Sequence, residues 1–146
     1  MATEVLTTIS PSTNQPIVTR HALSDSDIAL LPALSTQAFH NYKALPLEER
    51  QAIVGKALKL IGERQDSLET ELTRQMGRPI AYAGKEITTA VARGEYMLRI
   101  SREALKDTEG EPEKGFRRYI RKAPIGPVLI LIAWNVGRFL VLLQKA

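Results

Sequence analysis

The chain of 146 residues contains no cysteine, and only 5% of its residues are aromatic. Without cysteine these residues cannot form disulfides, thiolate metal sites or a thiol nucleophile. The two histidines, His21 and His40, do not have the spacing of metal ligands. The scarcity of aromatic rings leaves little material for stacking on nucleic-acid bases.

Charge of one sign is not in large excess either. Lys and Arg number 20 against 16 Asp and Glu, and the two kinds alternate along the chain. Interleaved charges of this kind indicate solvated helix faces rather than a nucleic-acid footprint. Hydrophobic residues make up 44%, which is ordinary for one globular domain. The first fifteen residues lack the basic and apolar regions of a secretory signal, so we expect a cytoplasmic location.

The first half of the chain predicts a hairpin followed by helices. Over residues 4–22, β-branched runs flank the turn PSTNQP, which is typical of a β-hairpin. Helices are expected over residues 24–105. Ser24 and Asp27 have the spacing of a capping box, and Pro32 is tolerable only in the first turns of the helix they begin.

Two longer helices are expected next, over 46–76 and 80–105. Pro46 with Glu48 and Glu49 begins the first, and Gly77 with Pro79 ends it. Apolar stripes of helical period indicate the buried faces. In the first helix the stripe is Ile53, Ala57, Leu60, Ile61, Leu68, Leu72 and Met76, and in the second it is Ile87, Val91, Gly94, Leu98 and Leu105.

Residues 107–115 are polar and contain Gly and Pro, so we expect a connecting loop there. The basic segment FRRYIRK follows at 116–122. One interpretation is a contact with phosphate or anionic lipid. The other is a β-strand near a sheet edge, where Lys and Arg discourage unwanted pairing, and Tyr119 and Ile120 favour it.

The apolar run at 127–134 predicts a strand buried on both faces of a parallel sheet. A membrane anchor is the alternative, because residues 124–143 carry a single charge, Arg138. Asn135 and Arg138 argue against an anchor, since a central Arg costs roughly 2.5–3.5 kcal/mol on insertion scales.

Taken in order, several segments resemble the N-terminal part of an aldehyde dehydrogenase. They are PSTNQPI, SDSDIALLPALSTQAF, PLEERQAIVGKALKLIGERQDSL, ELTRQMGRPIAYA and GFRRYIRKAPIGPVLILIAWN. The resemblance implies an α/β fold with a Rossmann-type cofactor domain. It also implies that 116–122 is an oligomerisation strand and that 124–146 begins the core of the cofactor domain. The family oxidises an aldehyde to a carboxylic acid with NAD or NADP.

By the same resemblance, Asn135 is the catalytic oxyanion donor, and Ile132, Ala133, Trp134 and Asn135 line the cofactor cleft. The family nucleophile is a cysteine, which these residues lack, and no carboxylate matches the general base. We therefore expect a truncated family member that is inactive alone. It should be marginally stable, with an exposed apolar patch near its end. The alternatives are a non-catalytic fragment that binds full-length subunits through Phe116–Lys122, or a tail-anchored protein.

Overall fold

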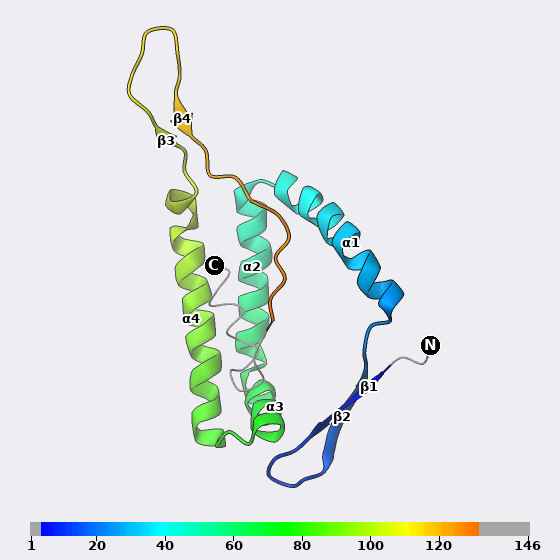
Figure 1. Cartoon of the computed structure of the whole chain (residues 1–146). Helices are drawn as coiled ribbons and strands as arrows, with labels where there is room; N and C mark the ends of the chain where they lie inside the picture. The colour runs from blue at the N-terminus through cyan, green and yellow to red at the C-terminus, as the bar shows by residue number, and fades with distance from the viewer. Residues whose placement is uncertain (1–3, 132–146) are drawn as a thin grey trace.

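The computed structural model describes residues 4–131. This part of the chain is mainly helical, with one short β-hairpin before the helices and another after them (Figure 1). The elements are β1 (Val5–Ile9), β2 (Pro16–His21), α1 (Asp25–Ala44), α2 (Leu47–Glu63), α3 (Gln65–Met76), α4 (Ile80–Ala104), β3 (Thr108–Glu109) and β4 (Tyr119–Ile120).

The first hairpin confirms the prediction for residues 4–22. Strands β1 and β2 pair antiparallel, with Thr7 opposite Thr19. The turn between them depends on Asn14, whose φ of 55° lies in the left-handed region that Asn tolerates. Ser10 is buried, donates its N–H to the Gln15 carbonyl at 2.9 Å, and accepts the Thr13 N–H at its hydroxyl at 3.3 Å. Local hydrogen bonds therefore set the reversal of the chain.

The tip of this hairpin rests on the corner between α3 and α4. Gly77 ends α3 with a φ of 72°, and a Cβ placed on it would lie 2.9 Å from Pro11 Cγ. The stop signal predicted from Gly77 and Pro79 is therefore confirmed, and glycine is needed there for two reasons. Beside the corner, Arg78 Nη1 lies 3.0 Å from Glu86 Oε2, which fixes the start of α4 against the turn.

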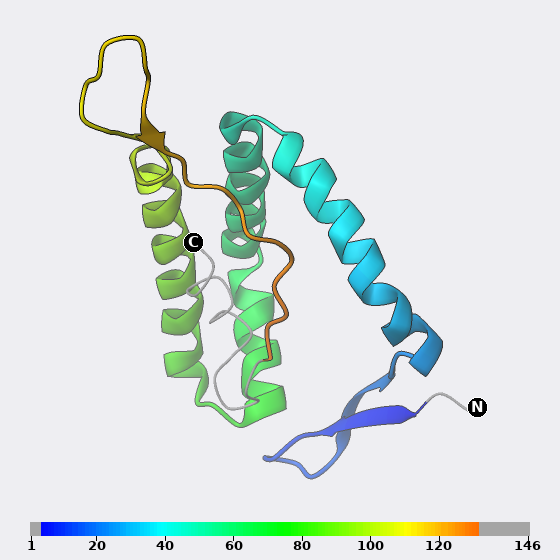
Figure 2. The same cartoon turned by 45° about the horizontal axis from the view of Figure 1, so that its top comes forward.

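Helix α1 begins as predicted. Ser24 is the N-cap, and it forms a capping box with Asp27. Pro32 is the eighth residue of the helix, so it lies deeper than the first turn, and α1 still continues to Ala44. Within the described residues α1 buries none of its side chains, and it stands away from the other helices (Figure 2).

The prediction of a single helix over 46–76 is wrong in one respect, because this part of the chain forms two helices, α2 and α3. The break lies at Arg64, whose φ of −101° and ψ of 13° depart from helical values. The Ser67 hydroxyl donates to the Arg64 carbonyl at 2.8 Å, a local bond of the kind that competes with the helix ladder. Gly62, just before the break, adds backbone freedom that an Ala would remove.

The hydrophobic core lies where α4 packs against α2 and α3. Its most buried members are Leu58 on α2, Leu72 on α3, and Ala83, Ile87, Ala90 and Gly94 on α4. The predicted stripes are only partly right. Ile53, Leu60 and Leu105 are 42–50% exposed, while Leu58, Ala83 and Ala90 are buried and were not predicted. Small side chains on α4 allow close approach of the helices, and periodicity of large apolar residues does not reveal them.

Within residues 107–115, predicted as a connecting loop, Thr108 and Glu109 form strand β3, which begins the second hairpin. Thr108 pairs with Ile120 and Glu109 with Tyr119 in antiparallel register. The strand predicted over 116–122 is present at Tyr119–Ile120, and a further bridge joins Glu113 to Phe116. This hairpin projects beyond the end of α4 (Figure 1).

The strand predicted over 127–134 is not formed in its described portion. Residues 127–131 have no ladder partner, because residues 4–131 provide no strand beside them. Ile125, Val128, Leu129 and Leu131 are mostly exposed, in agreement with the predicted apolar patch. Residues 132–134 lie outside the described part. None of the described helices combines the length and apolar character that crossing a membrane requires.

Candidate functional site

The family resemblance predicts four catalytic or cofactor-contacting residues. Ile132, Ala133, Trp134 and Asn135 all lie outside residues 4–131, so the structure does not test their assignment. The described chain leads to them through the extended segment Pro124–Leu131. Arg138, which decided against a membrane anchor, also lies outside the described residues.

The described residues alone do not form a dinucleotide site. Such sites use the turn between a parallel strand and a helix, whose N-terminus holds the pyrophosphate. Both sheets within residues 4–131 are antiparallel pairs, so they offer no junction of this kind. The same residues contain no group of three His, Cys, Asp or Glu side chains that could hold a metal ion.

The candidate segment for a function within the described residues is the second hairpin, residues 107–122. Strand alternation divides its side chains between two faces. We call one the arginine–tyrosine face, made of Asp107, Glu109, Arg117, Tyr119 and Arg121. We call the other the apolar face, made of Thr108, Gly110, Phe116, Arg118 and Ile120. The register supports the division, since Glu109 lies opposite Tyr119 and Thr108 opposite Ile120.

The arginine–tyrosine face is a closed set of polar contacts. Arg117 Nη2 donates to Glu109 Oε1 at 2.7 Å, and Arg121 donates to both carboxylate oxygens of Asp107, from Nε to Oδ1 and from Nη2 to Oδ2. The two guanidinium groups also flank the Tyr119 ring, at 5.1 and 4.8 Å from its centre. Each cation on this face therefore has both an acid and an aromatic partner, a favourable arrangement for Arg.

These contacts shift the ionisation of the groups involved. The hydrogen bond from Arg121 lowers the pKa of Asp107, because it stabilises the charged carboxylate. Hydrogen bonding to Glu109 raises the pKa of Arg117, and hydrogen bonding to Asp107 raises that of Arg121. These shifts favour the charged forms of Asp107, Arg117 and Arg121 at neutral pH.

The apolar face has few such contacts. Phe116 is 72% exposed and Ile120 is 70% exposed. The Gly110 N–H donates to the Arg118 carbonyl at 2.8 Å, and a Cβ placed on Gly110 would lie 3.3 Å from Arg118 Cβ, so the two residues approach closely. On this face Arg118 Nη2 lies 2.7 Å from Glu113 Oε2, so its charge is paired within the hairpin.

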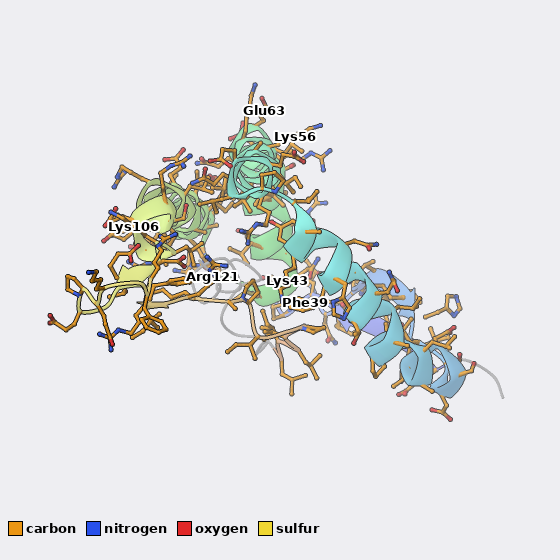
Figure 3. All side chains as sticks on the ribbon, turned by 90° about the horizontal axis from the view of Figure 1, so that it is seen from above. Phe39, Lys43, Lys56, Glu63, Lys106 and Arg121 are labelled. Atoms are coloured by element: carbon orange, nitrogen blue, oxygen red, sulfur yellow. The ribbon has the colours of Figure 1, made fainter. Side chains whose placement is uncertain are left out.

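The base of the hairpin is tied to the end of α4. The Lys122 ammonium donates to the Ala104 carbonyl at 2.7 Å, where a cation is favoured by the negative helix end. The bidentate contact between Arg121 and Asp107 also lies at the base of the hairpin. Seen from above, Lys106 lies at the end of α4, and Phe39 and Lys43 lie on α1 (Figure 3).

This geometry favours the strand interpretation of FRRYIRK over the anion-binding one. Its three arginines already have carboxylate partners within the hairpin, so they are not free for phosphate or lipid headgroups. Sequence reasoning missed Asp107, Glu109 and Glu113, which it assigned to a loop. Their alternate spacing, facing a basic segment across a Gly-containing turn, is the signal that could have revealed a hairpin.

The chain is similar in sequence to known proteins. The model of the family described as "Aldehyde dehydrogenase family" matches residues 1–146. A probable NADP-dependent succinate-semialdehyde dehydrogenase of Synechocystis sp. is 25% identical over 130 residues, which are 89% of this chain and 28% of that protein. The NADP-dependent succinate-semialdehyde dehydrogenase of Deinococcus radiodurans is 27% identical over 128 residues, or 88% and 27%.

Solved structures show the same arrangement. Succinic semialdehyde dehydrogenase from Streptococcus pyogenes, determined with NADP+, has a TM-score of 0.83 at 23% identity, covering 93% of this chain and 30% of that one. HpcC from Thermus thermophilus has a TM-score of 0.87 at 18% identity, covering 97% and 27%. The chain therefore has the fold of one part of these proteins, and it spans less than a third of their length.

Proposed function

The chain belongs to the aldehyde dehydrogenase family, and from that membership we propose that it is a part of an NAD(P)-dependent enzyme that oxidises an aldehyde to a carboxylic acid. The observation that supports this most strongly is the family match over all 146 residues. The names of the relatives point to semialdehydes as the substrate class, and the proposed location is the cytoplasm.

In this proposal Asn135 donates its side-chain amide N–H to the negative oxygen that forms on the substrate carbon. A neutral donor of this kind contributes roughly 2.7–4 kcal/mol in comparable sites. Ile132, Ala133 and Trp134 would contact the cofactor beside it. NAD or NADP, when bound, accepts the hydride, and the residues named here position the two reactants.

A polypeptide limited to these 146 residues is proposed to be inactive, because covalent catalysis needs a nucleophile and the sequence contains no cysteine. The test uses the purified chain with succinate semialdehyde and NAD+ or NADP+, following the absorbance of the reduced cofactor. We expect no turnover. Turnover that scales with the concentration of the chain would contradict the proposal.

The role of Asn135 is tested by complementation. The chain is co-expressed with the Deinococcus radiodurans enzyme from which the matching residues have been deleted. We expect the pair to recover aldehyde oxidation, and Asn135→Ala to lower kcat about 100- to 1,000-fold. The control is Gln144→Ala, at a residue to which no role is assigned. Equal activity of Asn135→Ala and the control would refute the role of Asn135.

A second function, association with other subunits of the family, is supported by the exposed hairpin. We propose that the segment Phe116–Lys122 mediates contact with a second copy of the chain or with a full-length subunit. Its projection beyond the helices makes it accessible to another molecule (Figure 1). Co-purification of the tagged chain with an untagged copy, and with a full-length relative, tests the proposal. Capture of neither would contradict it.

A further inference from the structure

We infer that the outer side of helix α4 carries a binding site for an acidic polypeptide segment, formed by Arg93, Tyr96 and Arg99. We call these three residues the α4 triad. The partner that fits them is an extended segment of another protein with two carboxylates two residues apart. The inference goes beyond the proposed oxidation of an aldehyde and does not depend on it.

The α4 triad has the same composition as the cluster on the second hairpin. The guanidinium carbons of Arg93 and Arg99 lie 5.5 and 5.3 Å from the centre of the Tyr96 ring. On the arginine–tyrosine face, two guanidinium groups flank Tyr119 at 5.1 and 4.8 Å. In both places one aromatic ring holds two cations, an arrangement that the electron-rich face of a tyrosine stabilises.

The two clusters differ in their acids. On the arginine–tyrosine face both guanidinium groups lie within 2.8 Å of a carboxylate oxygen, from Glu109 and Asp107. Neither Arg93 nor Arg99 takes part in an ion pair among residues 4–131. The α4 triad therefore has the cations and the ring of the hairpin cluster without its carboxylates, and a partner can supply them.

The acids on the same helix do not take this role. Glu95 lies four residues before Arg99 and Glu103 four residues after it, the spacing at which helical ion pairs form. Glu103 instead contacts Lys106 at 3.7 Å, and Glu95 belongs to no ion pair of the described residues. An exposed pair at this spacing contributes little to stability, so a carboxylate from outside can compete with it.

The α4 triad is accessible to another molecule. Helices α2 and α3 pack on the side of α4 that buries Ile87 and Gly94, and no other helix of the described chain lies on the opposite side (Figure 1, Figure 2). Tyr96 is 41% exposed, and both arginines are exposed. Because the ring already restrains both guanidinium groups, binding orders few additional side-chain torsions.

The number and spacing of the cations favour an acidic protein segment over a nucleic acid. A guanidinium group binds a carboxylate through two parallel N–H donors. Arg93 and Arg99 are six residues apart, which is about 9 Å along the helix axis. On the hairpin, Asp107 and Glu109 already show that acids two residues apart can serve two arginines. A nucleic acid gains its affinity from many phosphate contacts, and two cations supply few.

Peptide binding tests the inference. The full 146-residue chain is immobilised at low density, which prevents its self-association. A capped Gly-Glu-Gly-Glu-Gly peptide is passed over it, and binding is followed by surface plasmon resonance. We expect a Kd below about 1 mM that rises at least about fivefold between about 20 and about 200 mM sodium chloride, because exposed ion pairs are screened. The capped Gly-Gln-Gly-Gln-Gly peptide should bind at least about tenfold more weakly.

Matched variants locate the site. Arg93→Gln and Arg99→Gln each remove one cation of the triad. The control is Arg74→Gln on α3, because Arg74 is exposed and has no ion pair or ring contact within the described residues. We expect each triad variant to weaken peptide binding about three- to tenfold and the control less than about twofold. Tyr96→Leu keeps both charges and should weaken binding about two- to threefold, since the guanidinium groups lose their restraint.

Each outcome decides part of the inference. Loss of binding in the triad variants, with unchanged far-UV circular dichroism, supports the site. A wild type that does not bind the acidic peptide, or a control that loses as much binding as the triad variants, would overturn it. A single-stranded oligonucleotide that binds more tightly than the peptide, and depends on Arg93 and Arg99 in the same way, would overturn the identity of the partner. None of these readouts involves aldehyde oxidation, so failure here leaves the proposed function standing.

Discussion

Gly94 shows at the scale of one residue how closely α4 approaches α2. A Cβ added there would lie 2.5 Å from Leu58 Cδ2, and Leu58 is itself only 2% exposed. We predict that Gly94→Ala lowers the free energy of unfolding by about 1–3 kcal/mol, because overpacking exceeds the helix propensity that Ala gains. Urea denaturation measures the change.

Gly62 on α2 is the matched control, because nothing lies within 4 Å of an added Cβ. Gly62→Ala is expected to raise the free energy of unfolding by about 0.5–1 kcal/mol, through the reduced entropy of the unfolded chain. The close packing of α4 on α2 would be disproved if both substitutions stabilised the protein equally.

Asp107 gives the hairpin a dependence on pH. The Arg121 hydrogen bond lowers its pKa below the ordinary 3.8, so the unfolded chain takes up a proton there more readily than the folded one. The stabilisation is therefore fully present at pH values above the pKa of Asp107 in the unfolded chain. It is lost as the pH falls through the lower pKa of Asp107 in the folded chain. In an NMR titration of the Asp107 carboxyl, Arg121→Gln should return the midpoint to its ordinary value. An unchanged midpoint would show that the contact does not form.

At the scale of the element, α1 depends on its own sequence more than on packing. It buries no residue in the described part of the chain, so its N-terminus is held by Ser24. The Ser24 hydroxyl accepts the Asp27 N–H at 3.2 Å, and the Asp27 carboxylate accepts the Ser24 N–H at 3.2 Å. Helix propensity and N-terminal capping are therefore the main sources of the stability of α1.

We predict that Ser24→Ala frays the first turn of α1 by about 1 kcal/mol of local stability. Hydrogen exchange of the amides at the start of the helix measures this change. Ser35→Ala, in the middle of the same helix, should not increase exchange there. Similar exchange in both variants would mean that contacts outside the capping box hold the helix end.

At the scale of the whole molecule, we expect the extended segment 124–131 to dominate behaviour in solution. Leu129 and Leu131 are 85% and 87% exposed, and within residues 4–131 no strand pairs with this segment. An exposed apolar run with free backbone groups is prone to aggregation. We predict that the chain aggregates as its concentration rises.

Replacing both leucines, Leu129→Ser with Leu131→Ser, should reduce light scattering at a given concentration several-fold. Leu34→Ser on α1 is the control, because Leu34 is 62% exposed but lies in a regular helix. Equal effects would show that exposed apolar area in general, and not the unpaired segment, drives aggregation. A wild type that melts cooperatively as a monodisperse monomer would contradict the prediction itself.

The sequence alone was sufficient to predict the structural features that depend on local interactions. The hairpin of residues 4–22, the capping box of Ser24 and Asp27, and the helix stop at Gly77 were all predicted, because each depends on bonds between residues close in the chain. The family resemblance also came from the order of such segments, and the family match confirms it.

Only the tertiary structure decided the contacts between distant residues. Periodicity could not show that Leu58 faces Gly94, or that small alanines line α4, because burial depends on which helix lies opposite. It also could not pair Asp107 with Arg121 or distinguish two faces on FRRYIRK, since the sign and spacing of charges do not fix their partners. Local propensities determined the elements, and packing determined which of their sides are buried.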